Sequence, residues 1–203
     1  MRISRDAKKA TKAEAYALIV DMKTGRRELY PEDIDALLLY FAPALPKKAK
    51  TVEQWVAKAA ADPKEIREPL RYLYVKSGVV MASDGHRAHR GKTTLADGYY
   101  CPRTFAPVGF DGIFPDINRV YPDRKRLADF AVGALDKGAI MNEKTSKTLT
   151  YCRVPDGTAV NEAYLVDALN GREDGIIYHD PEAARNMAGD SEFGEWVITG
   201  MRV

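Results

Sequence analysis

The chain has little of what reactive or cofactor-bearing proteins use. It holds two cysteines and three histidines among 203 residues. Cys101 and Cys152 lie far apart and form no CxxC pair, which excludes a disulfide framework and a cysteine-based zinc motif. We therefore expect two buried, reduced thiols. Walker loops, GxSxG turns and dinucleotide-binding glycine patterns are also missing, so the sequence does not support an enzyme.

Histidine supplies one candidate metal pair, His86 and His89. No third ligand stands at a usual spacing, and the nearby Asp84 belongs to a turn signal. We therefore predict neither a bound metal nor another cofactor. Acidic residues are abundant but scattered, which leaves a nuclease or hydrolase possible but unsupported.

Long apolar runs and a strong net charge are missing as well. The apolar stretch from Ala15 to Val20 is too short for a secretory signal or a membrane span. We therefore expect a cytoplasmic protein with no membrane partner. The net charge of +2 and the sequence pI near 8.4 exclude a polybasic coat. Any contact with DNA would need locally clustered basic residues.

Short strand-like and helix-like segments alternate along the chain. Apolar spacing predicts helices over residues 33–41, 52–61, 124–135 and 161–169. The last of these begins at Asn161, a favourable N-cap. A turn signal near Ser77 and Gly78 predicts a hairpin over 71–82, and β-forming residues predict strands over 99–100, 105–110, 149–154, 176–178 and 196–203. This texture predicts an α+β fold in which two units of similar size meet near residues 114–122.

Three separated parts of the sequence resemble the bacterial DNA sliding clamp family, the beta subunit of DNA polymerase III. Residues 81–88 (MASDGHRA) resemble the family's hairpin turn, and residues 112–122 (GIFPDINRVYP) resemble its interdomain connector. At the end of the chain, residues 160–170 (VNEAYLVDALN) and 196–203 (WVITGMRV) resemble the last domain's helix and tail. These segments follow one another in the family's order.

The resemblance implies an α+β fold of clamp-like domains, with antiparallel sheets that carry helices on one face. It divides the chain into a clamp-like unit with a divergent N-terminal region (1–113), a connector (114–122) and a shortened C-terminal clamp-like unit (123–203). The family has three domains per chain, whereas this sequence has room for two. It therefore resembles a shortened relative, of a kind that would suit a phage.

The resemblance also implies a non-enzymatic role in DNA replication. Family members are processivity factors that bind short linear peptides of polymerase and clamp-loader proteins in a cleft between domains. The residues implied for that cleft come from the turn, the connector and the tail: Gly85, His86, Arg87, Ala88, Pro115, Arg119, Val120, Ile198, Gly200, Met201, Arg202 and Val203. Ala88 and Gly200 stand where the family has leucine and proline, which predicts a wider or weaker cleft. Taken singly, each residue could instead serve a turn or ordinary packing.

Family clamps encircle double-stranded DNA and touch its phosphates from inner helices without reading sequence. The residues implied for that contact are Lys47, Lys48, Lys50, Lys58, Arg124, Lys125 and Arg126. A solvated helix face is the alternative interpretation of these basic runs. Family rings hold six domain units, so two units per chain imply a homotrimeric ring. A non-encircling adaptor or decoy, which modulates a host clamp or its partners, is the alternative function.

Overall fold

The computed structural model describes residues 47–122, 128–131, 135–142, 147–154, 157–172, 176–179 and 186–201. Several predictions from the sequence lie outside these residues: the helix over 33–41, the candidate DNA contacts Arg124, Lys125 and Arg126, and the tail residues Arg202 and Val203. Among the helices of the described residues, none is long and apolar enough to span a membrane.

The described residues before the connector form one α-helix, one 3₁₀ helix and five strands. Helix α3 (Val52–Ala57) begins at Thr51, whose hydroxyl accepts a hydrogen bond from the Gln54 amide, and it is shorter than predicted. The predicted hairpin is confirmed as β1 (Leu73–Lys76) and β2 (Val79–Ser83), which turn through Ser77 and Gly78 at positive φ. A 3₁₀ helix, η2 (Glu68–Arg71), precedes this hairpin. The remaining strands are β3 (Arg87–Lys92), β4 (Gly98–Tyr100) and β5 (Pro107–Val108).

The connector contains a 3₁₀ helix, η3 (Ile117–Val120). The elements after it are β6 (Ala128–Ala131), β7 (Asp136–Asn142), β8 (Lys147–Arg153), β9 (Ala159–Asn161), α4 (Glu162–Leu169), β10 (Ile176–His179), β11 (Asn186–Ser191) and β12 (Gly194–Thr199). As predicted, α4 begins at Asn161, whose side-chain oxygen accepts the Ala163 amide at 2.9 Å. It ends at Asn170, which adopts the left-handed conformation at φ 51°.

One predicted helix is wrong where the structure describes it. Residues 128–131, within the helix predicted over 124–135, form strand β6 and pair antiparallel with β10. Local spacing had favoured a helix, but pairing with a distant strand overrides such weak local preference.

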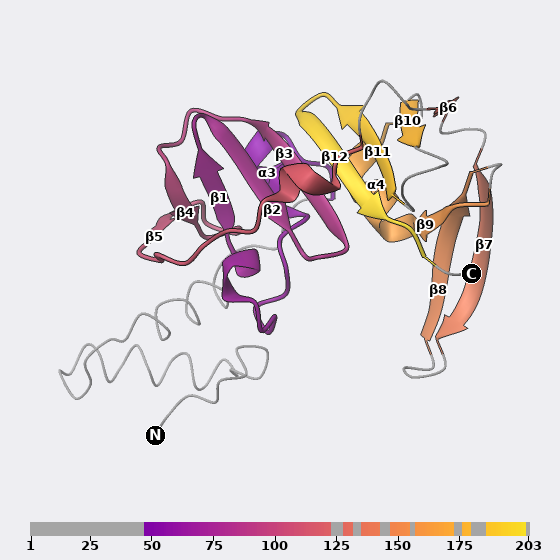
Figure 1. Cartoon of the computed structure of the whole chain (residues 1–203), viewed down its shortest axis with the longest axis horizontal. Helices are drawn as coiled ribbons and strands as arrows, with labels where there is room; N and C mark the ends of the chain where they lie inside the picture. Colours follow the sequence, from indigo (N-terminus) through magenta and orange to yellow (C-terminus); the bar gives the residue numbers. More distant parts are fainter. Residues whose placement is uncertain are drawn as a thin grey trace.

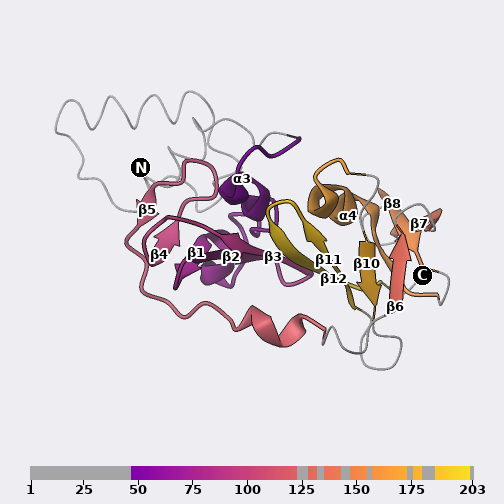
Figure 2. The ribbon, with the colours of Figure 1, turned by 90° about the horizontal axis from the view of Figure 1, so that it is seen from above.

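Nine strands form one antiparallel sheet in the order β5-β4-β1-β2-β3-β12-β11-β10-β6. A smaller sheet has the order β7-β8-β9. Figure 2 shows α3 and α4 on one face of the large sheet and the connector on the other. The α+β fold with antiparallel sheets and helices on one face is thereby confirmed. Pairing of β3 with β12 joins the strands before the connector to those after it (Figure 1).

A single buried cluster lies under the two helices and draws on both parts of the chain. Trp55 and Val80 come from before the connector, while Leu165, Ile177 and Ile198 come from after it. Cys101 and Cys152 are buried and free, as expected. On the opposite face a smaller cluster, which includes Phe114 and Ile117, packs beneath the connector.

Candidate functional site

A tight turn between β2 and β3 carries the segment that resembles the clamp hairpin turn. One carboxylate oxygen of Asp84 accepts the amides of His86 and Arg87, at 2.8 and 3.0 Å. The Ser83 hydroxyl accepts the Gly85 amide at 3.0 Å and donates to the Arg87 carbonyl at 2.8 Å. Gly85 has φ +87°, where glycine is strongly favoured. The turn is therefore fixed by its own side chains, with His86 exposed near its tip.

The end of β12 lies directly beside this turn. Arg87 and Ile198 are register partners in the β3–β12 pair, and the Thr199 amide donates to the His86 carbonyl at 2.8 Å. Two residues further on, the Met201 amide donates to the Ala159 carbonyl at the start of β9. The structure thus brings the predicted turn and tail together. Ile198 is fully buried, so it supports this surface from the core.

The connector crosses the other face of the β3–β12 junction and is pinned at both ends. The Tyr121 hydroxyl donates to the carbonyl of Ala88 or Glu195, each at 3.2 Å, and so bridges β3 and β12. Burial raises the pKa of Tyr121. At the other end, the Tyr99 hydroxyl donates to the Gly112 carbonyl at 2.8 Å. The connector backbone is therefore held against the sheet.

Apolar side chains of the connector remain exposed above this pinned backbone. The exposed side chains include two apolar residues predicted for the cleft, Pro115 and Val120, and the predicted Arg119 is exposed beside them. Sequence reasoning missed Ile113, which is 90% exposed. The Asn186 side chain of β11 donates to the Val120 carbonyl at 3.2 Å, which fixes the end of η3.

The side chains of Arg87 and Ala88 point to opposite faces of the sheet. Ala88 is 1% exposed and belongs to the cluster beneath the connector, with Phe114 and Ile117. Arg87 instead points to the helix face, where its guanidinium lies 4.3 Å from the ring centre of Tyr164 in α4. Predicted as two residues of one cleft wall, they serve different faces.

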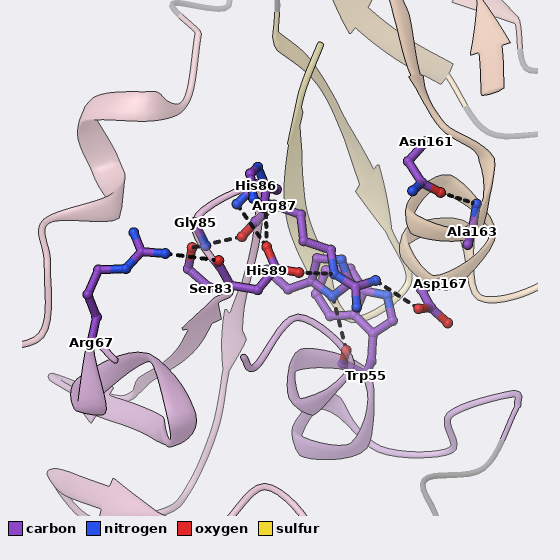
Figure 3. A network of polar contacts seen from close by, with 11 residues as sticks. Trp55, Arg67, Ser83, Gly85, His86, Arg87, His89, Asn161, Ala163 and Asp167 are labelled. Atoms are coloured by element: carbon purple, nitrogen blue, oxygen red, sulfur yellow. Dashed lines mark hydrogen bonds and ion pairs between the residues drawn. The ribbon is translucent and has the colours of Figure 1, made fainter. Parts of the chain in front are cut away.

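Charged contacts on the helix face connect the turn to α4 (Figure 3), and Lys58 extends them to the end of α3. Arg87 donates to Asp84 at 3.1 Å and to Asp167 of α4 at 2.8 Å. The Lys58 ammonium, at the C-cap of α3, lies 3.7 Å from the other oxygen of Asp167. Sequence reasoning missed Asp167 and Tyr164 as members of this site, although both lie within the recognised α4 segment.

Lys58 requires a correction to the predicted DNA-contacting set. Its side chain is 4% exposed, and its ammonium donates to the Lys47 carbonyl at 2.6 Å. Burial lowers the pKa of Lys58, with Asp167 opposing that shift. The ammonium is committed to neighbouring groups and cannot face a phosphate, whereas Lys47, Lys48 and Lys50 are exposed.

Neither α-helix of the described residues carries a lysine or arginine. Helix α3 contains Glu53, and α4 contains Glu162 and Asp167. A hydrogen bond from Lys137 is the main cause that lowers the pKa of Glu162. The two described α-helices therefore offer no basic side chain of their own, whereas the 3₁₀ helices η2 and η3 contain Arg71 and Arg119.

The two histidines weighed as a metal pair do not meet. His89 is fully buried and stacks on Trp55, with ring centres 4.4 Å apart, while its Nδ1 lies 3.0 Å from the Trp55 carbonyl oxygen. Burial lowers the pKa of His89 to about 3, which keeps the ring neutral. Within the described residues, no group of three histidine, cysteine or acidic side chains could hold a metal ion.

No family model matches this sequence, and no curated protein matches it either. Solved structures do match. The DNA polymerase III beta chain from Streptococcus pneumoniae has 16% identity and a TM-score of 0.50, with 82% of this chain and 68% of that chain covered. The sliding clamp from Bartonella birtlesii, bound to griselimycin, has 14% identity and a TM-score of 0.53 over 81% of this chain and 70% of its own.

The beta clamp of H. pylori, in complex with diflunisal, is similar over 80% of this chain and 65% of its own, at 12% identity and a TM-score of 0.51. Identities this low show the fold alone. The resemblance seen in the turn, the connector and the C-terminal segments is accordingly confirmed at that level: this chain has the fold of the bacterial sliding clamp, the beta subunit of DNA polymerase III.

Proposed function

We propose that this chain is a sliding-clamp-like docking protein, a processivity factor or platform for replication proteins. Short linear peptides of polymerase or clamp-loader proteins would bind on the surface formed by the β2–β3 turn and the C-terminal tail, beside the connector. The observation that carries this proposal is the hydrogen bond from the Thr199 amide to the His86 carbonyl, which places the turn beside the tail. A docking role, rather than catalysis, fits the fold.

The chemistry around this junction suits an extended peptide. Pro115 and Val120 offer rigid apolar contacts on a pinned backbone, and Met201 offers an adaptable one. Arg119 is exposed and can hold a peptide carboxylate or carbonyl through its fork of donors. The small residue Gly200 leaves room for a bulky ligand side chain, whereas Ala88 is buried beneath the connector.

Griselimycin, which the Bartonella clamp binds, is a defined probe for this surface. We expect calorimetry to show binding that weakens about tenfold in Met201→Ala, because a buried anchor of a binding surface contributes on that order. Deletion of Arg202 and Val203 should weaken binding in the same direction. Met141→Ala is the matched control, since Met141 lies on β7 and is 70% exposed.

Both tail variants should keep the melting temperature of the parent chain. Equal affinity of Met201→Ala and the parent, with both folded, would remove the tail from the docking surface. A parent chain that binds neither griselimycin nor a clamp-binding peptide would refute the docking function itself.

A second function is favoured by the acidic character of the two described α-helices, α3 and α4. A non-encircling adaptor or decoy would bind the peptides of a host clamp's partners without touching DNA, and it needs no basic inner surface. A homotrimeric ring would instead need phosphate contacts from Lys47, Lys48 and Lys50, and from the arginines and lysine at 124–126.

Mass photometry and retention on DNA separate the two functions. A trimer that stays on circular DNA and slides off linear DNA would establish an encircling clamp. In that case, replacing Lys47, Lys48 and Lys50 with glutamine should flatten the salt dependence of DNA binding. A monomer that binds griselimycin but not DNA would establish the adaptor.

A further inference from the structure

Arg87 has little freedom to contact a ligand. Its side chain is 11% exposed and is held by two carboxylates, Asp84 at 3.1 Å and Asp167 at 2.8 Å. The face of the guanidinium lies over the Tyr164 ring. Two nitrogens and one face of the group are thus engaged by this chain itself, on the face of the sheet away from the connector.

Asp84 links this contact to the shape of the turn. One of its oxygens accepts the amides of His86 and Arg87, and the other accepts the Arg87 guanidinium. A shift of the guanidinium would therefore move Asp84 and change its hydrogen bond to the His86 amide. The carbonyl of the same residue accepts the Thr199 amide.

Asp167 anchors the other end of the contact. It lies in the last turn of α4, a helix fixed at its start by the Asn161 cap and at its end by Asn170. The side chain of Asn170 bonds both the amide and the carbonyl of Ala49, at 2.7 and 3.1 Å. The anchor therefore lies on a helix fixed at both ends, with its own side chain 35% exposed, whereas the turn is a surface element.

The charges alternate along this line of contacts. Asp84, Arg87, Asp167 and Lys58 follow one another as negative, positive, negative and positive. Removal of one member leaves its neighbours partly buried without full compensation, which is unfavourable. The arrangement is consequently sensitive to a single neutral substitution.

We propose that Arg87, with Asp84 and Asp167, forms a latch that sets the conformation of the docking turn from the opposite face of the sheet. Arg87 is then a positioning residue and not a ligand contact. This inference rests on the proposed docking function, and it identifies how the core controls that surface. Affinity for a docked ligand should depend on an ion pair that the ligand never touches.

Hydrogen exchange tests the latch without any ligand. In Asp167→Asn, we expect the amides of His86, Arg87 and Thr199 to exchange about tenfold faster, because hydrogen bonds to charged groups are worth at least that factor. The amides of Trp196 and Val197, further along β12, should keep their protection. Arg87→Lys should behave like Asp167→Asn, since a single ammonium cannot bridge two carboxylates with a planar fork.

Griselimycin affinity gives the second measurement. Arg87→Met and Asp167→Asn should each weaken binding about tenfold, and the double variant should be no weaker than either single variant. Lys92→Gln, which removes an exposed charge at the far end of the same strand, is the control and should change neither measurement.

Unchanged exchange at the turn in both Asp167→Asn and Arg87→Lys would overturn the latch. Additive losses of affinity would overturn it as well, since they would mean that Arg87 and Asp167 act separately. If the parent chain binds neither griselimycin nor a clamp-binding peptide, the docking function falls, and the exchange measurement alone decides the latch.

Discussion

The buried His89 predicts a loss of stability in mild acid. Burial lowers the pKa of His89 to about 3, and the cations Arg87 and Lys58 add to this shift against the hydrogen bond with the Trp55 carbonyl. In the unfolded chain the ring titrates near pH 6.5. The unfolded state therefore binds the proton first as pH falls, so stability is complete above pH 6.5 and is lost progressively below it.

The size of this loss follows from the two pKa values. Between pH 8 and pH 5, the free energy of unfolding should fall by about 2 kcal/mol from His89 alone. Any folded-state pKa below 4 gives nearly the same result at pH 5, because the native ring stays neutral there. The full loss, reached only below pH 3, is about 5 kcal/mol at 1.36 kcal/mol per unit.

Urea unfolding at a series of pH values measures this effect. His89→Phe keeps an aromatic ring against Trp55 but cannot titrate. Between pH 8 and pH 5, its free energy of unfolding should therefore fall by about 2 kcal/mol less than that of the parent chain. His86→Gln, which removes an exposed histidine, is the control and should retain the dependence of the parent chain. Equal slopes for the parent and His89→Phe would refute the assignment to His89.

Three further outcomes follow from the packing. Tyr121→Phe should lower the free energy of unfolding by about 1–2 kcal/mol in urea, because the hydroxyl that bridges the Ala88 and Glu195 carbonyls is lost; no change would mean that water replaces it fully. Gly194→Ala should destabilise the chain by about 3 kcal/mol in the same assay, since its φ is +153° and a Cβ would lie 2.1 Å from the Arg90 carbonyl oxygen; parent-like stability would contradict that clash. Trp55 precedes the connector in the sequence and Trp196 follows it, yet both belong to one buried cluster. Trp55→Phe and Trp196→Phe each retain one tryptophan, so in each variant the fluorescence transition should coincide with the loss of circular dichroism. Two separate transitions would mean two independent units.

Local signals in the sequence predicted the elements that depend on local chemistry. The Ser77–Gly78 turn and the Asn161 cap act within a few residues, and both are as predicted. Strand β6 was predicted as helix because its pairing with β10 involves residues far away in the chain. Strands β3, β7, β9 and β11 were missed for the same reason: they are defined by pairing with partner strands and not by their composition.

The candidate site was predictable as far as family-like segments reached. The turn, connector and tail were recognised, and the turn and tail do meet. Arg87 and Ala88 face opposite sides because they are neighbours in strand β3, which was not predicted from the sequence. Which of the two lies beneath Phe114 depends on packing with distant parts of the chain. Nor could the sequence reveal that Lys58 is buried against Asp167 while Lys47, Lys48 and Lys50 stay exposed.

The joint between the two parts of the chain does not depend on the connector alone. Strands β3 and β12 pair along five positions, and the Trp55 indole donates to the Ala168 carbonyl at 2.9 Å. A chain cleaved between Arg119 and Val120 should therefore hold together as a non-covalent complex. The two fragments could be exchanged for labelled or redesigned versions, so the molecule can be studied as a split protein.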